Sequence, residues 1–461
     1  MRSIAFFVTF FMLFLIGCAS STKVEPQFEM PDTLGEGESE GAELPEKWWE
    51  VFGDAELDRI MEQAIGENFS LKAYAERFEQ AKAVAKLNGA DIYPTISAGI
   101  GFDENLTNAN GRPANYNSEK YSVSLSISYE IDLWGRIRAL RDSANYSLQA
   151  SAEDFEAAAV SLSATVAETW FQLTAKRATL KILEDQHDVN EKYAELTRLS
   201  YSGGAADAGD ILQQKQQLLS IESEISAAKT EITVLENLLS VLVGKPPRSE
   251  QFPESADLPE MPEFPKTGLP SELIERRPDV RSAYFAVKKA DSSLAAALAD
   301  RYPKLSLSAS GGLGSQDITT LFKTWFVNLA ANLTAPIFNG GRNQATVEKN
   351  EAEVREALNS YSQKVLSALQ ETEDAIAKEK GEREKLENLQ SQYEIAKNLT
   401  ELRNSEFTAG KTTYFFVLEA LKNEQSVEKA LLSARCSLLL NRISLYKAIA
   451  GGFKTEAGKK E

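Results

Sequence analysis

The stretch Tyr121-Ser-Val-Ser-Leu-Ser-Ile-Ser-Tyr-Glu-Ile131 places an apolar residue at every odd position and a polar residue at every even position. Side chains of a β-strand point alternately to its two faces, so the stretch predicts a strand with one apolar and one polar face. Such a strand fits either a soluble β-sandwich or a membrane β-barrel. The next residues, Asp132-Leu-Trp-Gly-Arg136, lead without a loop into a long helical segment, and this succession favours a protein that crosses a membrane.

The helical segment runs from Gly135 to about Leu199, and no proline or further glycine interrupts it. A helix of about 60 residues is about 90 Å long, whereas an ordinary globular helix has about 11 residues. Its apolar residues recur at the spacing of one helix face. They are Leu140, Ala144, Leu148, Phe155, Ala159, Leu162, Val166, Trp170, Leu173, Leu180 and Leu183.

The composition excludes several classes of protein. The 461 residues carry a formal net charge of −18, which argues against a nucleic-acid partner because phosphates require basic surfaces. Cys18, Cys436 and the one histidine, His187, cannot assemble a disulfide framework or a zinc site. His187 is more typical of a packing or surface residue than of a ligand. With no phosphate-binding loop and no nucleophile beside a base, the sequence predicts neither an enzyme nor a resident cofactor or metal.

The first residues have the pattern of a targeting segment. Arg2 precedes an apolar run from Ile4 to Ile16, and Leu15-Ile-Gly-Cys18 resembles the lipobox of bacterial lipoproteins, in which the cysteine is lipidated. An ordinary signal peptide with an incidental cysteine is the alternative. We expect a signal peptide over residues 1–17 and a lipid-anchored tether over 18–45. No other apolar run reaches the roughly 18 residues of a transmembrane helix, so a bilayer crossing would require a β-barrel.

The rest of the chain divides into two similar halves, each with leading helices, two strands, a long helix, a turn and a return helix. The first half spans 46–245, with strands 95–103 and 121–132, long helix 135–199 and return helix 210–243. The second half spans 271–451, with strands 304–313 and 324–337, long helix 341–404 and return helix 414–450. We also expect one helix from Leu57 to about Gly89, a loop over 103–120, a linker over 246–270 and a tail over 452–461.

A constant offset of 206 residues relates the two halves, which indicates a tandem duplication. It matches Gly135 with Gly341, Arg136 with Arg342, Tyr201 with Phe407, Gly204 with Gly410, and Leu212 with Leu418. The first return helix also carries the heptad seam of a coiled coil. Its seam residues are Leu218, Ile221, Ile225, Ala228, Ile232, Leu235, Leu239 and Leu242.

Four amphipathic strands cannot close a membrane barrel, because unpaired edges in lipid cost several kcal/mol per backbone group. Two chains would supply eight strands and three chains twelve. An eight-stranded barrel is largely filled by side chains, whereas twelve strands surround a wider channel. We therefore expect a homotrimer.

Several motifs together resemble the TolC-like outer-membrane efflux factors, in their lipoprotein branch. They are Leu15–Cys18, Tyr129-Glu-Ile-Asp-Leu-Trp-Gly-Arg136, Arg277-Pro-Asp-Val280, Pro336-Ile-Phe-Asn-Gly-Gly-Arg342 and Phe407-Thr-Ala-Gly410. The resemblance implies an α+β membrane protein: a trimeric 12-stranded outer-membrane β-barrel continuous with a long periplasmic α-helical barrel. It further implies a passive duct for small molecules, anchored in the outer membrane and reaching into the periplasm. Its partners would be a periplasmic adaptor and an inner-membrane pump.

The expected roles of residues follow from this resemblance and from the strand pattern. Side chains facing the outer-membrane lipid would be Tyr121, Val123, Leu125, Ile127 and Tyr129, with the intervening serines facing the lumen. The adaptor-docking tip would comprise Tyr201, Gly203, Gly204, Phe407, Gly410 and Lys411. The acidic channel entrance would comprise Asp207, Asp210 and Glu419.

Other functions stay open at this point. Within the family the cargo could instead be a metal ion or a polypeptide secreted by a type I system. A structural coiled-coil lipoprotein of the envelope would explain the helices, but not the two pairs of amphipathic strands that precede them. A secreted polymer-binding enzyme would need a cleft lined by acids, which the sequence does not indicate.

Overall fold

The computed structural model of the chain describes residues 24–31, 33, 45, 47–107, 116–204, 206–255, 257–265, 270 and 275–449. Cys18 and the expected signal peptide lie outside these residues. The chain forms two compact units. The first contains Met1–Gln27, Arg77–Ser151 and Ser282–Ser362, and the second contains Phe28–Glu76, Ala152–Arg281 and Gln363–Glu461.

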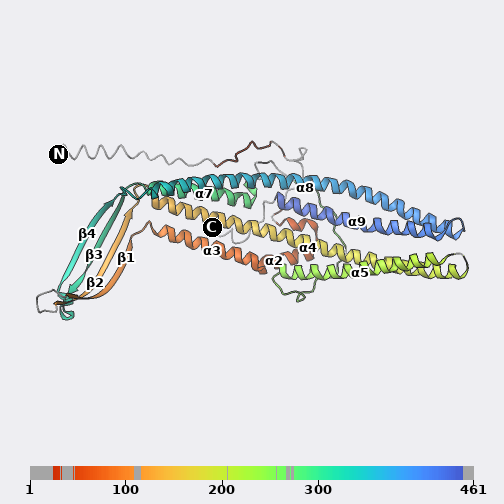
Figure 1. Ribbon diagram of the computed structural model, residues 1–461, viewed down its shortest axis with the longest axis horizontal. Coiled ribbons are helices and arrows are strands. Elements are labelled where there is room, and N and C mark those ends of the chain that lie inside the picture. Colours follow the sequence, from red (N-terminus) through yellow and green to blue (C-terminus); the bar gives the residue numbers. More distant parts are fainter. Residues whose placement is uncertain are drawn as a thin grey trace. The chain divides into compact units, whose positions relative to one another are not determined.

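The first unit is built on a four-stranded antiparallel sheet, in which the strands lie side by side in chain order (Figure 1). The two hairpins predicted from the alternating sequence therefore join into one sheet. Its strands are β1 (Thr95–Thr107), β2 (Tyr116–Ile131), β3 (Lys304–Ser315) and β4 (Trp325–Thr334), with the short 3-10 helix η2 (Ile318–Lys323) between β3 and β4.

The register of the sheet gathers the apolar residues on one face. Val123 of β2 lies opposite Ile100 of β1 and opposite Leu313 of β3, which in turn lies opposite Trp325 of β4. Because the side-chain period of a strand is two, a slip of one residue in any pairing would mix the two faces. The register thus produces one continuous apolar face across all four strands.

The hairpin of β1 and β2 is longer than the sequence predicts. Residues 103–120 were expected to form a loop, but the pairing continues from Asp103 opposite Lys120 to Thr107 opposite Tyr116. Opposite charges such as Asp103 and Lys120 favour a directly paired position. The prediction was wrong because alternation of apolar and polar residues stops at Phe102, whereas backbone hydrogen bonding does not require it.

The passage from strand to helix in the first unit is held by aromatic and ionic contacts. Trp134 stacks on Tyr302 with 4.8 Å between ring centroids, and its indole nitrogen donates to the carbonyl of Pro303 at 2.8 Å. Arg136 pairs with Glu130 at 2.9 Å, so the first residue of the long helix is tied to the end of β2. These contacts explain why no loop separates the two elements.

The second unit contains two helical hairpins, and their bounds repeat the predicted offset to the residue (Figure 1). The long helices α4 (Arg136–Ser202) and α8 (Arg342–Thr408), which begin in the first unit, each have 67 residues. The return helices α5 (Ala208–Leu242) and α9 (Tyr414–Ala448) each have 35 residues. Both pairs start 206 residues apart. The duplication inferred from a few matched residues therefore extends to every helix end of the hairpins.

The helix expected from Leu57 to Gly89 is two helices, α2 (Ala55–Glu67) and α3 (Phe69–Ala90). Asn68 between them has an extended backbone. Its side-chain oxygen accepts from the amide of Leu71 at 3.0 Å, and its amide group donates to the carbonyl of Leu242 at 2.9 Å. Asparagine is a favoured N-cap residue, so this position ends one helix and starts the next.

The core of the second unit is aromatic on one side of α4. The short helix η1 (Trp48–Phe52) buries both tryptophans and Phe52. Phe52 packs on Phe171 of α4 with 5.0 Å between centroids, and Trp48 packs on Tyr446 of α9 at 5.6 Å. This segment begins the ordered body at the position that the sequence predicts.

Two buried arginines fasten the ends of the linker and of α7 (Pro278–Ala299) within the second unit. Arg442 of α9 pairs with Glu379 of α8, and it also donates to the carbonyl groups of Pro262 and Glu263 at 2.7 and 2.6 Å. Arg277 pairs with Glu371 at 2.7 Å and donates to the last helical carbonyl of α9, that of Ala448, at 3.0 Å. A charge is tolerated in such a site only when partners surround it.

Among the described residues, no helix combines the length and the apolar composition that a membrane-spanning helix needs.

Candidate functional site

The turn of the first hairpin is formed by a left-handed glycine and a reciprocal acidic cap. Gly204 has φ 78°, and its amide donates to the carbonyl of Tyr201 at 3.0 Å. Asp207 accepts from the amide of Asp210 at 3.0 Å, while the carboxylate of Asp210 accepts from the amide of Asp207 at 3.0 Å. This is a capping box, in which two carboxylates satisfy free amides at the start of α5.

The turn of the second hairpin uses the same backbone with other side chains. Gly410 has φ 70°, and the amides of Gly410 and Lys411 donate to the carbonyls of Phe407 and Glu406 at 2.9 and 2.8 Å. These two bonds form a Schellman motif, which closes the C-terminus of α8. The following N-cap, Thr413, makes no side-chain capping bond.

The two predicted turns lie together at one end of the second unit (Figure 1). Tyr193 of α4 donates to the side-chain oxygen of Asn404 of α8 at 2.8 Å, and Tyr414 of α9 donates to that of Gln214 of α5 at 2.9 Å. Each bond joins one hairpin to the other. The sequence offset matched the turns in sequence, and these bonds place them side by side.

The acidic residues expected at the entrance occupy different environments. Asp207 and Asp210 already serve the capping box. Glu419 is exposed on α9, where it follows the exposed rings of Phe415 and Phe416 by four and three residues. Residues at these spacings share one helix face. Glu419 therefore points away from the buried face of α9.

The aromatic residues that the offset equates at the tip also differ. Tyr201 is exposed, whereas the ring of Phe407 is half-buried and packs on Tyr414 with 5.8 Å between centroids. Gly203, Gly204, Gly410 and Lys411 are exposed. Of the residues predicted to dock an adaptor, Phe407 alone has a side chain that supports the turn from inside.

Tyr414 is a tip residue that the sequence analysis missed. It is buried with Val417 and Leu418 and touches Phe407 and Tyr193. Burial raises the pKa of Tyr414 to about 12, so its hydroxyl stays protonated and remains a donor to Gln214. The available signal was the position of Tyr414, immediately after Thr413, where the return helix was predicted to begin.

The five residues predicted to face lipid share the apolar face of the sheet. Phe102 packs on Tyr121 with 5.0 Å between ring centroids, on the face that also carries Val123 and Leu125. On the opposite face, the hydroxyl oxygens of Ser97 and Ser126 lie 3.1 Å apart. Ile127 and Tyr129 continue the apolar row toward α4.

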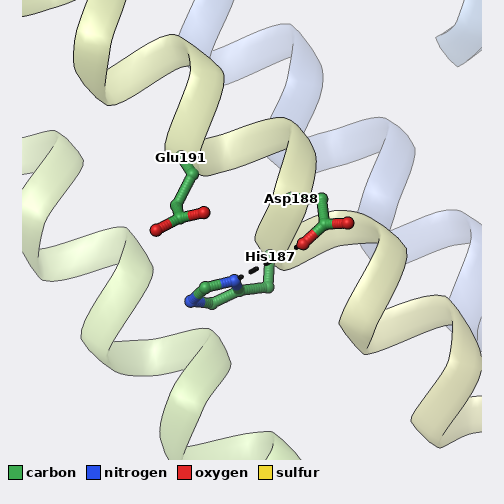
Figure 2. Close-up of side chains that lie close together, drawn as sticks. All are labelled: His187, Asp188 and Glu191. Atoms are coloured by element: carbon green, nitrogen blue, oxygen red, sulfur yellow. Dashed lines mark ion pairs between the residues drawn. The ribbon is translucent and has the colours of Figure 1, made fainter.

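A His–carboxylate cluster lies on α4, away from the turns (Figure 2). Potential ligand atoms of His187, Asp188 and Glu191 lie within 4.8 Å of one another. The two ring nitrogens of His187 face carboxylates on opposite sides, Asp188 at 3.9 Å and Glu222 of α5 at 3.7 Å. Asp188 and Glu191 are exposed. The arrangement is that of a surface charge pair between two helices, and it gives no sign of a ligand.

The sequence of the whole body matches one protein family. The model of the family described as "Outer membrane efflux protein" matches residues 60–245 and 269–451. The chain is 31% identical to the pyoverdine export outer membrane protein OpmQ of Pseudomonas aeruginosa, over 92% of this chain and 90% of that protein. It is 28% identical to the toluene efflux pump outer membrane protein TtgC of Pseudomonas putida, over 89% of this chain and 86% of that protein.

The fold matches a solved channel over nearly the full chain. The open state of the Neisseria gonorrhoeae MtrE outer membrane channel superposes with a TM-score of 0.86 at 25% identity. The match covers 95% of this chain and 99% of that one.

Proposed function

The chain belongs to the outer membrane efflux protein family, and from this premise we propose that three copies form the outer membrane duct of a tripartite system that exports small molecules. Family membership confirms three of the predictions. The protein is an outer membrane efflux channel that extends into the periplasm, it is a passive duct rather than an enzyme, and its fold is TolC-like with an internal repeat.

The continuous apolar face of the sheet carries the proposal of a membrane barrel. In all three strand pairings an apolar residue or glycine of that face lies opposite another, as Val123 does between Ile100 and Leu313. Many of these side chains are exposed in the single chain, including Ile100, Leu329 and Leu333. A face of this size and composition needs an apolar solvent or a partner, and the lipid bilayer provides the former.

The two edges of the sheet support assembly from several copies. β1 pairs only with β2, and β4 only with β3, so each leaves one edge without a partner in the chain. Pairing of β4 with β1 of the next copy would close the sheet and satisfy these edges. Three copies give twelve strands, and this number leaves room for a channel that eight strands would not.

One substitution and a neighbouring control test the barrel. Leu125 lies on the apolar face and Ser126 on the polar face of the same strand. Arginine on the lipid side of a membrane barrel costs about 2–4 kcal/mol at the midplane. Leu125→Arg should therefore lower the yield of heat-resistant trimers on gels, whereas Ser126→Arg should leave assembly intact. Equal damage by both would contradict a membrane strand.

Partners at the other end are proposed from the turns. Exposed Tyr201, Gly203, Gly204, Gly410 and Lys411 form a surface on the paired turns, and a periplasmic adaptor bound there would connect the duct to an inner-membrane pump. Phe407 would shape this surface indirectly, because its ring packs on Tyr414. Cross-linking from a photoreactive residue at position 201 to a co-expressed adaptor would test the surface.

Small organic molecules are the proposed cargo. The names of OpmQ and TtgC assign pyoverdine and toluene to those two proteins. Both are small molecules of unlike polarity, so a duct of this kind accepts what its pump delivers. Loss of resistance to organic toxicants on deletion of the gene, restored by the wild-type chain, would support this cargo over a polypeptide or a metal ion.

Lipidation of Cys18 is proposed from the sequence Leu15-Ile-Gly-Cys18 alone. Labelling with a fatty acid should mark the wild-type protein and disappear in Cys18→Ser. Several acyl chains would add anchoring, since each buried methylene contributes about 0.8 kcal/mol.

A further inference from the structure

Four amide side chains are buried between the two hairpins of the second unit, where an apolar seam would be expected. Gln186 and Asn190 of α4 are 4% and 0% exposed, Gln214 of α5 is 1% exposed, and Gln425 of α9 is 7% exposed. Gln214 precedes the predicted seam residue Leu218 by four positions, so it continues the heptad spacing with a polar residue. Together with Tyr414, these residues are called the amide ladder below.

The hydrogen bonds of the amide ladder run across three helices. The amide group of Gln214 donates to the backbone carbonyl and the side-chain oxygen of Asn190 at 2.8 and 3.1 Å. Asn190 donates to the side-chain oxygen of Gln425 at 3.3 Å, and Gln186 donates to the backbone carbonyl of Gln425 at 3.2 Å. The hydroxyl of Tyr414 donates to the side-chain oxygen of Gln214 at 2.9 Å. Of the buried side-chain atoms that lack a hydrogen bond in the described chain, none belongs to the ladder.

Directional bonds in a seam do what apolar packing cannot. Two helices joined by leucine, valine and alanine can rotate or slide against each other and still bury a similar area. Buried amides tolerate only the alignment that pairs them, since an unpaired buried polar group costs about 1–3 kcal/mol. A single polar seam residue fixes the register of a coiled coil for this reason.

The ladder is not a product of the duplication. At the offset of 206 residues, Asn190 corresponds to Ala396 and Gln425 corresponds to Leu219. Ala396 is buried without a polar side chain, and Leu219 is exposed. The amides therefore occur where unlike hairpins meet, and not at each copy of one helix position.

We propose that the amide ladder is a register clamp, which fixes the axial and rotational alignment of α9 against α4 and α5. From Tyr414 to Gln425 it covers the first 12 residues of α9, which is about 18 Å of helix. It thus holds the second turn level with the first. The proposal needs no assumption about cargo, partners or oligomeric state.

The test replaces both partners of each ladder bond in the full-length protein, with Asn190→Leu, Gln214→Leu, Gln425→Leu and Tyr414→Phe combined. Replacing all partners together removes the penalty of unpaired groups, so the variant should keep its thermal stability or gain some. Amide hydrogen exchange in the first 12 residues of α9 should nevertheless accelerate at least tenfold. A cryo-EM map should show α9 near the turn displaced, by about 5 Å for one helical turn, or in more than one alignment.

Thr400→Val is the matched control. Thr400 is buried in α8 near the same turn, but its hydroxyl bonds only to the carbonyl of Ala396 in its own helix, at 3.1 Å. This variant should leave exchange and alignment unchanged. If the fourfold variant does not assemble, the pair Gln214→Leu with Tyr414→Phe is measured in the same way.

The outcomes separate a clamp from a merely stabilising network. Retained stability with altered alignment supports the clamp. Wild-type alignment and exchange in an assembled variant overturn it. A fall in thermal stability with unchanged alignment also overturns it, because the amides would then hold the hairpins together without setting their register.

Discussion

At the first turn a capping box joins Asp207 to Asp210, whereas the equivalent positions of the second turn hold Thr413 and Phe416, and Thr413 makes no capping bond. The second turn is held instead by buried Tyr414, whose first-turn equivalent is Ala208. Both turns keep a left-handed glycine at the same place. The duplicated backbone has thus been retained while its support changed from polar capping to aromatic packing.

Removing the aromatic support should have the largest effect. Tyr414→Ala empties a buried site, and loss of a large aromatic core residue costs about 3–5 kcal/mol. Hydrogen exchange should show that opening free energy lost around the second turn. Tyr201→Ala, at an exposed ring of the first turn, should change stability by at most about 0.5 kcal/mol. Similar losses in the two variants would contradict the difference between the turns.

The glycines should respond alike, because they are the part that the turns share. Added Cβ atoms at Gly204 and Gly410 would meet no other atom within 4 Å. The cost of alanine is then the left-handed backbone alone, about 1–2 kcal/mol at each turn. Gly203 has ordinary space for a Cβ and no left-handed φ, so Gly203→Ala is a control that should be tolerated. Unequal costs at Gly204 and Gly410, measured by hydrogen exchange, would show that the backbones differ in strain.

Removing the caps should separate the turns again, by a smaller amount. Asp207→Ala deletes a side-chain cap of α5 and should cost about 1 kcal/mol. Thr413→Ala removes no capping bond and should cost less. The measurement is the exchange of amides in the first turn of α5 and of α9. A larger loss for Thr413→Ala would indicate that its hydroxyl caps α9 after all.

The smallest change in stability and the sharpest change in function are expected at Glu419. Its equivalent in the first repeat is Gln213, which is also exposed. If Glu419 from each copy surrounds the channel entrance, three converging carboxylates attract cations. Glu419→Ala should then weaken cation selectivity and relieve block by multivalent cations in planar bilayers, while Gln213→Ala should not. Unchanged selectivity would leave Asp207 and Asp210 as the candidate ring, although both serve the cap.

Much of this architecture could be predicted because it depends on periodic patterns. Alternation in Tyr121–Ile131 specified a strand and its two faces, and the offset between Gly135 and Gly341 specified the second hairpin. Positions set by single contacts were missed. Asn68 divides a predicted helix because it also binds Leu242, which lies far away in sequence. Asp207 and Asp210 were assigned by charge, although their spacing of three residues is that of a capping box. The pairing of Gln214 with Asn190 follows only from the packing of two hairpins.

The polar face of the sheet is built from very small, uncharged groups over its middle length. Across Thr95–Gly101, Ser122–Ser128, Ser306–Gly314 and Phe326–Asn332, no side chain on that face is ionisable. Solution beside this stretch meets hydroxyl groups, amides and bare backbone, with no fixed charge to concentrate or exclude an ion. Conductance along it would scale with the conductivity of the bathing electrolyte. Any rectification, or any departure from that proportionality at low ionic strength, would have to originate in charged residues elsewhere in the chain.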